Sequence, residues 1–237
     1  MKFAIIAAGE GSRLQQEGVH LPKPLVTLHG EPLIDRLIRI FRRCGAAEVN
    51  IIVNQRYPEV AAHLRQLSGE TGMPEIRLVV KDTPSSMHSF FELSPFLSTE
   101  SFCLTTVDTI FREEEFTAYV RAFQRDADYD GMMAVTEYVD DEKPLYVATD
   151  SALNITGFHD ARAEADRYVS GGIYCLRPSA LHTLRRCMEC GVSRMRNFQR
   201  ALVADKQRLK ACPFSKILDV DHVSDIRKAE EFLAARP

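Results

Sequence analysis

Short hydrophobic runs alternate with amphipathic segments along the first half of the chain. Four apolar runs predict buried strands, at residues 2–8, 48–53, 76–81 and 101–107. The segments that follow them predict helices, at residues 32–43, 58–67, 86–97 and 113–125. Within 32–43, for example, Leu33, Leu37 and Ile40 share one stripe while the arginines lie elsewhere. This alternation of strand and helix predicts a parallel sheet with helices on both faces.

The pattern changes after residue 130. Strands are predicted one after another, without helices between them, at 131–138, 145–149, 153–158 and 172–176. Helical segments return at 178–190, 193–204 and 223–235, with strands at 208–212 and 216–220. We therefore expect a three-layer α/β/α fold whose mostly parallel, Rossmann-like mixed sheet has an antiparallel extension. No segment has the composition of a linker, so residues 1–237 are predicted to form a single domain.

Composition and charge exclude several classes of protein. The chain has 237 residues, 45% of them hydrophobic and 27% charged, which is typical of a folded globular domain. The net charge of −3 gives no basic field, so we expect no nucleic-acid partner. No apolar stretch approaches the length of a membrane span, and no membrane partner is expected.

The cysteines predict free thiols in a cytoplasmic protein. Cys103 and Cys175 lie inside apolar runs, as buried free thiols do, and no export signal precedes them. Cys187 and Cys190 have the spacing of metal ligands. A structural zinc site needs four ligands, however, and no second pair with ligand spacing is present in the sequence.

A glycine-rich segment directly follows the first predicted strand. It runs Ala7-Ala8-Gly9-Glu10-Gly11-Ser12-Arg13-Leu14. Glycines let the backbone approach a bulky anion closely, and their amides can point at phosphate oxygens. Leu14 stands where the dinucleotide fingerprint has its third glycine, and no P-loop lysine follows at the required spacing. A tight turn and a phosphate site remain equally open for this segment alone.

A lysine between two prolines changes that balance. Pro22 and Pro24 restrict the backbone around Lys23 and therefore fix where its ammonium group points. Arg13 lies about ten residues earlier, in the glycine-rich segment. Two cations that converge on one loop suit a triphosphate, so we predict phosphate contacts for Arg13 and Lys23.

Together the two segments resemble the N-terminal signature of the sugar-nucleotidyltransferases, the pyrophosphorylase family with a GT-A-like fold. That signature is an apolar strand, then A-A-G-x-G-[ST]-R-[LM], then P-K-[PA]-[LM], which residues 5–14 and 22–25 match. The resemblance implies a fold of the nucleotide-diphospho-sugar transferase type. We expect a nucleotide-binding half at about 1–110 and an acceptor-binding half at about 111–237.

The resemblance also implies the reaction and its substrates. A nucleoside monophosphate would pass from a nucleoside triphosphate to a sugar 1-phosphate, with release of pyrophosphate and with Mg²⁺ as cofactor. Arg13 and Lys23 would be the catalytic residues, neutralising the triphosphate and the leaving pyrophosphate. The residues expected to bind the nucleotide are Ala7, Ala8, Gly9, Gly11, Ser12, Ser85 and Ser86. Helix capping is an alternative role for the two serines of the 85–86 pair.

Two aspartates are expected to hold the metal. Asp108 ends a buried strand, at the edge where α/β sheets bind ligands, and a carboxylate there calls for a cationic partner. The resemblance assigns this residue to Mg²⁺. The second ligand is expected at Asp221, with Asp219 as its substitute. Capping of the last helix is the alternative for Asp221.

The acceptor side is less defined. Gly172 lies in a Ser-Gly-Gly-Ile-Tyr segment that resembles the family's glycine strand beside the sugar. Asp160 stands where many relatives have a sugar-gripping Glu-Lys-Pro, and Lys143 is a loop cation that could meet the acceptor phosphate. We expect these three residues to bind a small phosphorylated acceptor.

Several alternatives remain open from the sequence. Since the Glu-Lys-Pro motif is missing, a cytidylyltransferase for phosphocholine or a similar alcohol phosphate remains an alternative to the sugar enzyme. A non-catalytic regulatory protein that binds nucleotide sugars is the alternative from another class. A homodimer is compatible with the family. The side chains do not indicate which base the nucleoside triphosphate carries.

Overall fold

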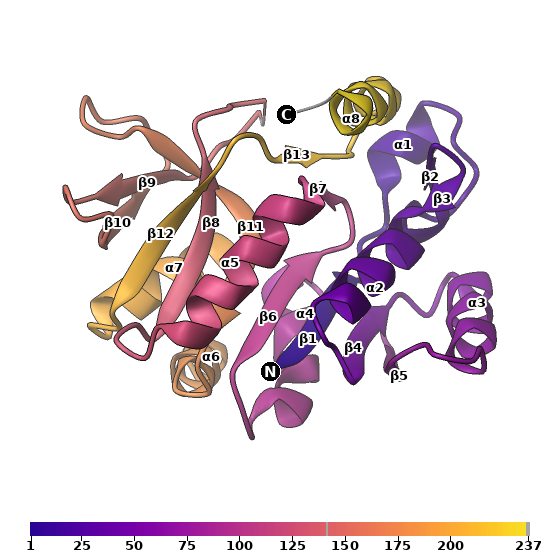
Figure 1. The fold of residues 1–237 in the computed structure, drawn as a ribbon, viewed down its shortest axis with the longest axis horizontal. Helices are drawn as coiled ribbons and strands as arrows, with labels where there is room; N and C mark the ends of the chain where they lie inside the picture. The colour runs from indigo at the N-terminus through magenta and orange to yellow at the C-terminus, as the bar shows by residue number, and fades with distance from the viewer. Residues whose placement is uncertain (141, 236–237) are drawn as a thin grey trace.

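The computed structural model describes residues 1–140 and 142–235, and Figure 1 shows its ribbon. A nine-stranded sheet runs through it in the order β10-β9-β11-β6-β1-β4-β5, with β8 beside β11 and β12 beside β8. The parallel part consists of β1 (Lys2–Ala7), β4 (Glu48–Val53), β5 (Glu75–Val80) and β6 (Phe102–Thr106). The predicted three-layer fold with a mostly parallel sheet is confirmed.

Side chains of β1 alternate between two hydrophobic clusters, because successive residues of a strand point to opposite faces. Phe3 and Ile5 belong to one cluster, whereas Ala4 and Ile6 belong to the other. The first cluster includes side chains of α2 (Leu33–Arg43), α3 (Pro58–Ser68), α5 (Glu113–Arg125) and α8 (Val223–Ala234). The second includes side chains of α4 (Ser86–Leu93), α6 (Ala180–Glu189) and α7 (Met195–Ala204). Helices therefore cover both faces of the sheet, as predicted.

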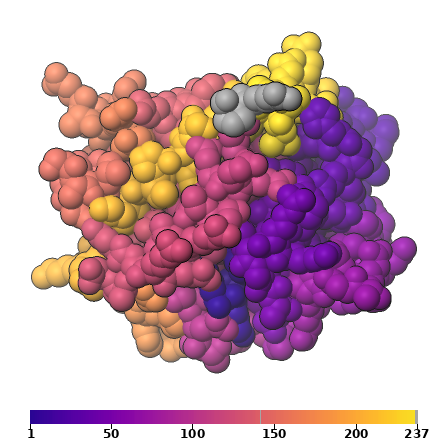
Figure 2. Space-filling view, viewed as in Figure 1, coloured from indigo at the N-terminus to yellow at the C-terminus, as the bar shows by residue number. Residues whose placement is uncertain are grey.

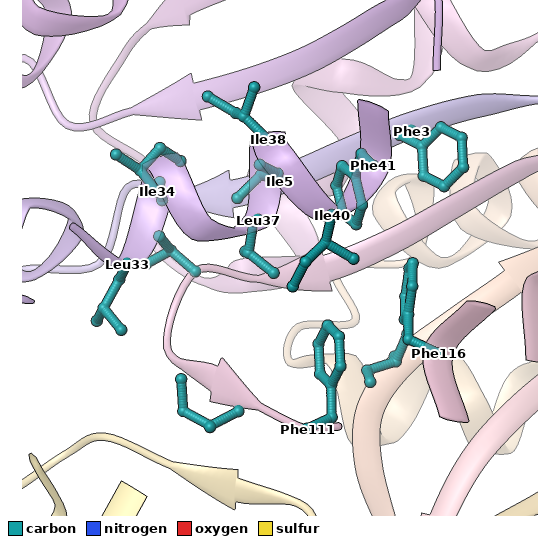
Figure 3. Close-up of a cluster of buried hydrophobic side chains, with 14 of the residues drawn as sticks. Phe3, Ile5, Leu33, Ile34, Leu37, Ile38, Ile40, Phe41, Phe111 and Phe116 are labelled. Carbon is teal, nitrogen blue, oxygen red and sulfur yellow. The ribbon is translucent and has the colours of Figure 1, made fainter. Parts of the chain in front are cut away.

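Aromatic rings fill the layer between α2 and the sheet (Figure 3). The ring of Phe41 lies 4.7 Å from that of Phe3, and the rings of Phe111 and Phe116 are 4.8 Å apart. Burying such rings contributes about 1.5–3 kcal/mol each to stability. This packing fixes β1 and β6, the two strands whose carboxyl ends carry the glycine-rich segment and Asp108.

The predicted antiparallel extension is also present. Its strands are β8 (Gly131–Thr136), β9 (Tyr146–Thr149), β10 (Ile155–His159), β11 (Tyr168–Leu176) and β12 (Leu209–Phe214). Strand β11 is antiparallel to β6, β8 and β9, whereas β12 is parallel to β8. The buried Tyr119 hydroxyl donates to the Met132 carbonyl (2.5 Å) and accepts from the Cys175 amide (2.7 Å). Helix α5 is thereby tied to both β8 and β11.

Short elements differ from the predictions, because a few residues carry no periodicity. The unexpected ones are α1 (Ser12–Gln16), the 3-10 turn η1 (Lys23–Leu25), β2 (Thr27–Leu28), β3 (Glu31–Pro32) and β7 (Thr109–Ile110). The helix predicted at 86–97 ends at Leu93 and continues as the 3-10 turn η2 (Ser94–Leu97), where Pro95 lacks an amide donor. The strand predicted at 216–220 shortens to β13 (Leu218–Asp219), which pairs with β7 outside the main sheet.

The C-terminal helix returns to the first part of the chain. Figure 2 shows α8, in yellow, beside the indigo and purple residues and away from the orange ones. The His29 amide donates to the Glu230 carboxylate at 2.8 Å, which joins α8 to the turn between β2 and β3. This return carries residues 218–222 toward the glycine-rich segment. In the described part of the chain, no helix has the length and apolar character needed to cross a membrane.

Candidate active site

A cavity of about 860 Å³ lies at the carboxyl ends of the parallel strands. Its walls come from residues 8–11 after β1, Asn54 and Arg56 after β4, 82–86 after β5, and 106–108 after β6. Four adjacent strands at a spacing of about 4.8 Å span roughly 14 Å, which suits an extended nucleotide. The cavity therefore lies where α/β sheets bind their ligands.

The glycine-rich segment forms one wall of this cavity. Gly11 has a φ of +63°, and a Cβ there would lie 3.1 Å from the Cβ of Lys23, so both backbone conformation and space favour glycine. Ala8, Gly9, Gly11 and Ser12 line the cavity as expected. Ala7 does not: it is the last residue of β1, is buried, and pairs with Val53.

Ser85 and Ser86 also line the cavity, at the start of α4. Ser85 has extended backbone angles, and its side chain makes no capping hydrogen bond. Its hydroxyl lies 2.8 Å from Nδ1 of His88 instead. A capping hydrogen bond therefore does not explain Ser85, which remains a lining residue of the large cavity.

Lys23 is the centre of a chain of charges at the inner end of the cavity. Its residue is only 8% exposed, and its ammonium pairs with Asp108 and, at 2.7 Å, with Oδ1 of Asp221. The other carboxylate oxygen of Asp221 accepts from Nη1 of Arg13 at 2.9 Å. The structure thus brings together four residues that the sequence predicted for the site, from positions as far apart as 13 and 221.

The buried pair of Lys23 and Asp108 is charged. Burial alone would lower the pKa of Lys23, but the charges of Asp108 and Asp221 raise it above its ordinary value. Burial alone would raise the pKa of Asp108, but the Lys23 charge and hydrogen bond lower it. An ammonium has three donors, and two of them are used here, so one remains for a ligand oxygen.

Asp219 and Asp221 have different surroundings. Removal from water and the negative charge of Asp108 raise the pKa of Asp219 to about 8, against the opposing effect of the Lys23 charge, although the residue as a whole is exposed. The backbone of Asp219 pairs with Thr109 in the small sheet. Of these two aspartates, Asp221 is the one that contacts Lys23. The N-cap of α8 is His222, in a capping box with Asp225, so capping does not account for Asp221.

The donor set fits Mg²⁺ that is completed by substrate. Among residues 1–140 and 142–235, no group of three or more His, Cys, Asp or Glu side chains is arranged to hold a metal alone. Mg²⁺ is commonly bound through one or two carboxylates plus phosphates. Asp108 and Asp221, held on one ammonium, offer such a pair beside a cavity large enough for a triphosphate.

A second cavity, of about 230 Å³, adjoins the first, and Arg13 and Asp221 line both. Its other walls include Tyr138, Ser170 and Gly171 from the β8 and β11 region and Lys228 from α8. Lys228 pairs with Asp140 at 2.9 Å and with Asp225 at 3.2 Å. The Arg13–Asp221 pair therefore marks the junction between a large cavity and a small polar one.

The residues expected to bind the acceptor are not among the described residues that line this second cavity. Asp160 pairs with Arg196 at 2.6 Å and with Arg200 at 2.7 Å, and neither Asp160 nor Lys143 is among the described residues that line the two cavities. Gly172, with a φ of +71°, follows the lining residue Gly171. The polar wall residues that the sequence did not indicate include Tyr138, Asp140 and Lys228.

Comparison with known proteins identifies the family of the chain. The model of the MobA-like NTP transferase domain matches residues 3–205. The chain belongs to this family. It is 28% identical over 241 residues to a bifunctional IPC transferase and DIPP synthase of Rubrobacter xylanophilus, covering 97% of the chain and 51% of that protein. It is also 32% identical over 93 residues to a choline-phosphate cytidylyltransferase of Streptococcus pneumoniae, covering 39% of the chain and 38% of that enzyme.

Solved structures share the fold of this NTP transferase domain. An inositol-1-phosphate CTP transferase from T. maritima superposes with a TM-score of 0.79 at 18% identity, covering 99% of this chain and 98% of that one. A putative glucose-1-phosphate thymidylyltransferase from Bacillus anthracis gives 0.84 at 16% identity, covering 100% and 96%. The predicted fold and nucleotidyltransferase family are confirmed. The chain spans about half the length of the Rubrobacter relative.

Proposed function

We propose that this domain catalyses Mg²⁺-dependent transfer of a nucleoside monophosphate from a nucleoside triphosphate to a small phosphorylated acceptor. The observation that carries the proposal is the Arg13–Asp221–Lys23–Asp108 chain at the junction of the two cavities. It combines two cations for phosphate oxygens with two carboxylates for a metal. The large cavity accommodates the nucleotide, and the small one accommodates the acceptor.

The reaction proceeds by in-line displacement at the α-phosphorus. An oxygen of the acceptor phosphate forms a bond to the α-phosphorus, while the bond from that phosphorus to the bridging oxygen of pyrophosphate breaks. The nucleophile is already an anion, so no side chain has to remove a proton. Catalysis therefore depends on positioning and on neutralising charge.

Residues of this chain supply both the positioning and the charge neutralisation. Lys23, with one donor left after its two carboxylate contacts, neutralises charge on the triphosphate and the leaving pyrophosphate. Arg13 faces both cavities, so it orients the two phosphate groups toward each other. Asp108 and Asp221 would hold Mg²⁺, which when bound supplies Lewis-acid charge neutralisation at the phosphates.

The acceptor is proposed to be a monophosphate about the size of one sugar ring. At about 30 Å³ per water molecule, the second cavity has room for about seven to eight waters. Relatives are named for inositol 1-phosphate, choline phosphate and glucose 1-phosphate. CTP with inositol 1-phosphate is the first pair to test, because the T. maritima neighbour, which matches this chain over 99% of its length, is named for that pair. Sugar 1-phosphates and phosphocholine are the next acceptors.

The test is pyrophosphate release with Mg²⁺ across CTP, GTP, UTP, dTTP and ATP, each paired with the three acceptor classes. One productive pair is expected. Its rate should fall by about 10- to 100-fold in Asp108→Asn, because the neutral amide no longer balances Lys23 or offers a charged metal ligand. Asp35→Asn is the matched control, since its partner is His63, away from both cavities, and its rate should stay unchanged.

Two outcomes would contradict the proposal. Equal rates in Asp108→Asn and the unaltered protein would show that this site does not take part in the reaction. Nucleotide binding by calorimetry without pyrophosphate release from any pair would favour a regulatory protein that binds nucleotides without turning them over.

A further inference from the structure

Four consecutive residues after β4 contact the two neighbouring wall segments of the large cavity, which follow β1 and β5. We propose that this positioning segment, Asn54-Gln55-Arg56-Tyr57, sets the orientation of the glycine-rich segment for the nucleotide. Tyr57 and Asn54 are its main positioning residues. The inference rests on the proposed function, because it assigns the segment to nucleotide binding and not to acceptor binding.

Asn54 and Tyr57 hold two carbonyl groups of the glycine-rich segment. The Asn54 amide donates to the Ala8 carbonyl at 3.1 Å, and the Tyr57 hydroxyl donates to the Glu10 carbonyl, also at 3.1 Å. In a trans peptide the carbonyl and the next N–H point in opposite directions. These two bonds therefore turn the N–H groups of Gly9 and Gly11 away from the positioning segment.

The two glycine N–H groups are available to a ligand. Within residues 1–140 and 142–235, neither N–H has a hydrogen-bond partner, and both glycines line the large cavity. A pair of open backbone amides next to Arg13 and Lys23 is a binding site for phosphate oxygens. The glycines have no side chains that could fix this orientation, so it has to come from their neighbours.

Tyr57 also reaches the helix that carries Arg13. Its hydroxyl accepts from the Gln15 side-chain amide at 2.6 Å while donating to Glu10. Gln15 lies on α1, two residues after Arg13. One phenolic oxygen thus connects the amide-bearing turn with the helix that supplies a proposed catalytic cation.

Gln55 and Arg56, in the middle of the positioning segment, contact the loop after β5. Gln55 donates to both carboxylate oxygens of Asp82, from its backbone and its side chain, each at 3.1 Å. Arg56 pairs with Glu10 and lies 3.4 Å from Asp82. These groups are largely exposed, so solvent screens the ion pairs. Asn54, which is 4% exposed, is therefore expected to matter most, together with Tyr57, whose one hydroxyl bonds two partners.

If the glycine-rich segment is already oriented before the nucleotide binds, less conformational entropy is lost on binding. Tyr57→Phe removes the two neutral hydrogen bonds of the Tyr57 hydroxyl, which is expected to weaken binding of CTP with Mg²⁺ by about fivefold. The measurement is calorimetry without acceptor, repeated with the triphosphate that proves productive. KM for the nucleotide should rise by a similar factor, and by more than KM for the acceptor changes. A merely structural role would not separate these constants.

Tyr129→Phe is the matched control. It removes a phenolic hydroxyl bonded to Asn154, and Tyr129 is not among the described residues lining either cavity, so nucleotide affinity should not change. Wild-type affinity in Tyr57→Phe, or an equal effect in both variants, would overturn the inference. Neither result depends on turnover. Failure of the unaltered protein to bind any of the five triphosphates would overturn the proposed function and this inference together.

Discussion

The proposed nucleotide side and the proposed acceptor side of the site are built in different ways. On the nucleotide side, the loops after β1, β4, β5 and β6 come from adjacent parallel strands and meet at one edge of the sheet. On the acceptor side, Tyr138, Ser170 and Lys228 come from β8, β11 and α8 regions that are distant in sequence. The first arrangement follows from local strand–loop units, whereas the second exists only after the whole chain has folded.

The groups offered to ligand differ as well. The nucleotide side presents backbone amides of glycines, fixed by buried neighbours such as Asn54. The acceptor side presents ion-paired side chains, of which Lys228 with Asp140 and Asp225 is an example, and these are partly exposed. We infer that the reaction depends on the rigid side and that acceptor selection depends on the side whose ion pairs can rearrange. The following variants test this difference.

Lys23 should show the largest effect, because it serves both sides. Lys23→Met leaves the partly buried Asp108 carboxylate without its cation, so we expect a loss of about 2–3 kcal/mol in the free energy of unfolding. Turnover should fall by at least about 100-fold. Urea unfolding and pyrophosphate release measure the two quantities on the same preparation.

Lys23→Arg separates charge from geometry. It keeps the positive charge, so most of the stability should return, but a planar guanidinium cannot replace a compact ammonium between Asp108 and Asp221. Turnover should stay about tenfold below that of the unaltered protein. Lys81→Met is the surface control, since it loses only an exposed pair with Glu92. Full activity in Lys23→Met would end the catalytic assignment.

Asp219 and Asp221 provide the second comparison. Asp221→Asn removes a charged partner of Lys23 and Arg13, so we expect about a tenfold lower rate and a higher Mg²⁺ requirement. Asp219→Asn should lower the rate less, since in the described part of the chain Lys23 forms ion pairs with Asp108 and Asp221 and not with Asp219. The reverse order would move the second metal ligand to Asp219.

The raised pKa of Asp219 gives this pair a distinct pH signature. With a folded pKa of about 8, the protonated form of Asp219 stabilises the fold. That contribution is complete below about pH 4 and is lost as the pH rises through the folded pKa. Asp219→Asn stays neutral, so without divalent metal its free energy of unfolding should fall less than that of the unaltered protein between acidic and mildly alkaline pH. Parallel pH curves would contradict the raised pKa.

The sequence predicted the nucleotide side well because its signals are local. The fold class, the helix over 113–125 and the placement of Arg13, Lys23, Asp108 and Asp221 in one cluster all agree with the structure. Periodicity indicates the strands, and parallel topology then brings their carboxyl ends together. The positioning segment was missed, although Asn54 directly follows a predicted strand at that edge, because no motif marks a residue that acts on a neighbour's carbonyl.

The acceptor side was harder to predict for a physical reason. Asp160 was chosen by its position in a family motif and Lys143 as a loop cation, but Asp160 is engaged by Arg196 and Arg200 of α7. Lys228 was overlooked because it lies on a polar helix face, where a lysine is normally solvated. Only the return of α8 to the first part of the chain turns that face into a cavity wall. Such tertiary contacts have no periodic or compositional signal.

Lys228 should show the smallest effect, confined to the acceptor. Lys228→Ala frees Asp140 and Asp225 from their shared cation, which leaves more negative charge beside the acceptor cavity. KM for an anionic acceptor should therefore rise by about three- to fivefold, as expected for a partly exposed charge contact, while KM for the nucleotide stays constant. Arg227→Ala is the neighbouring control, because Arg227 is highly exposed and pairs with Glu231 on the same helix. An increase in nucleotide KM with Lys228→Ala would show that the two sides are coupled, and the division between a rigid nucleotide side and an adjustable acceptor side would then fail.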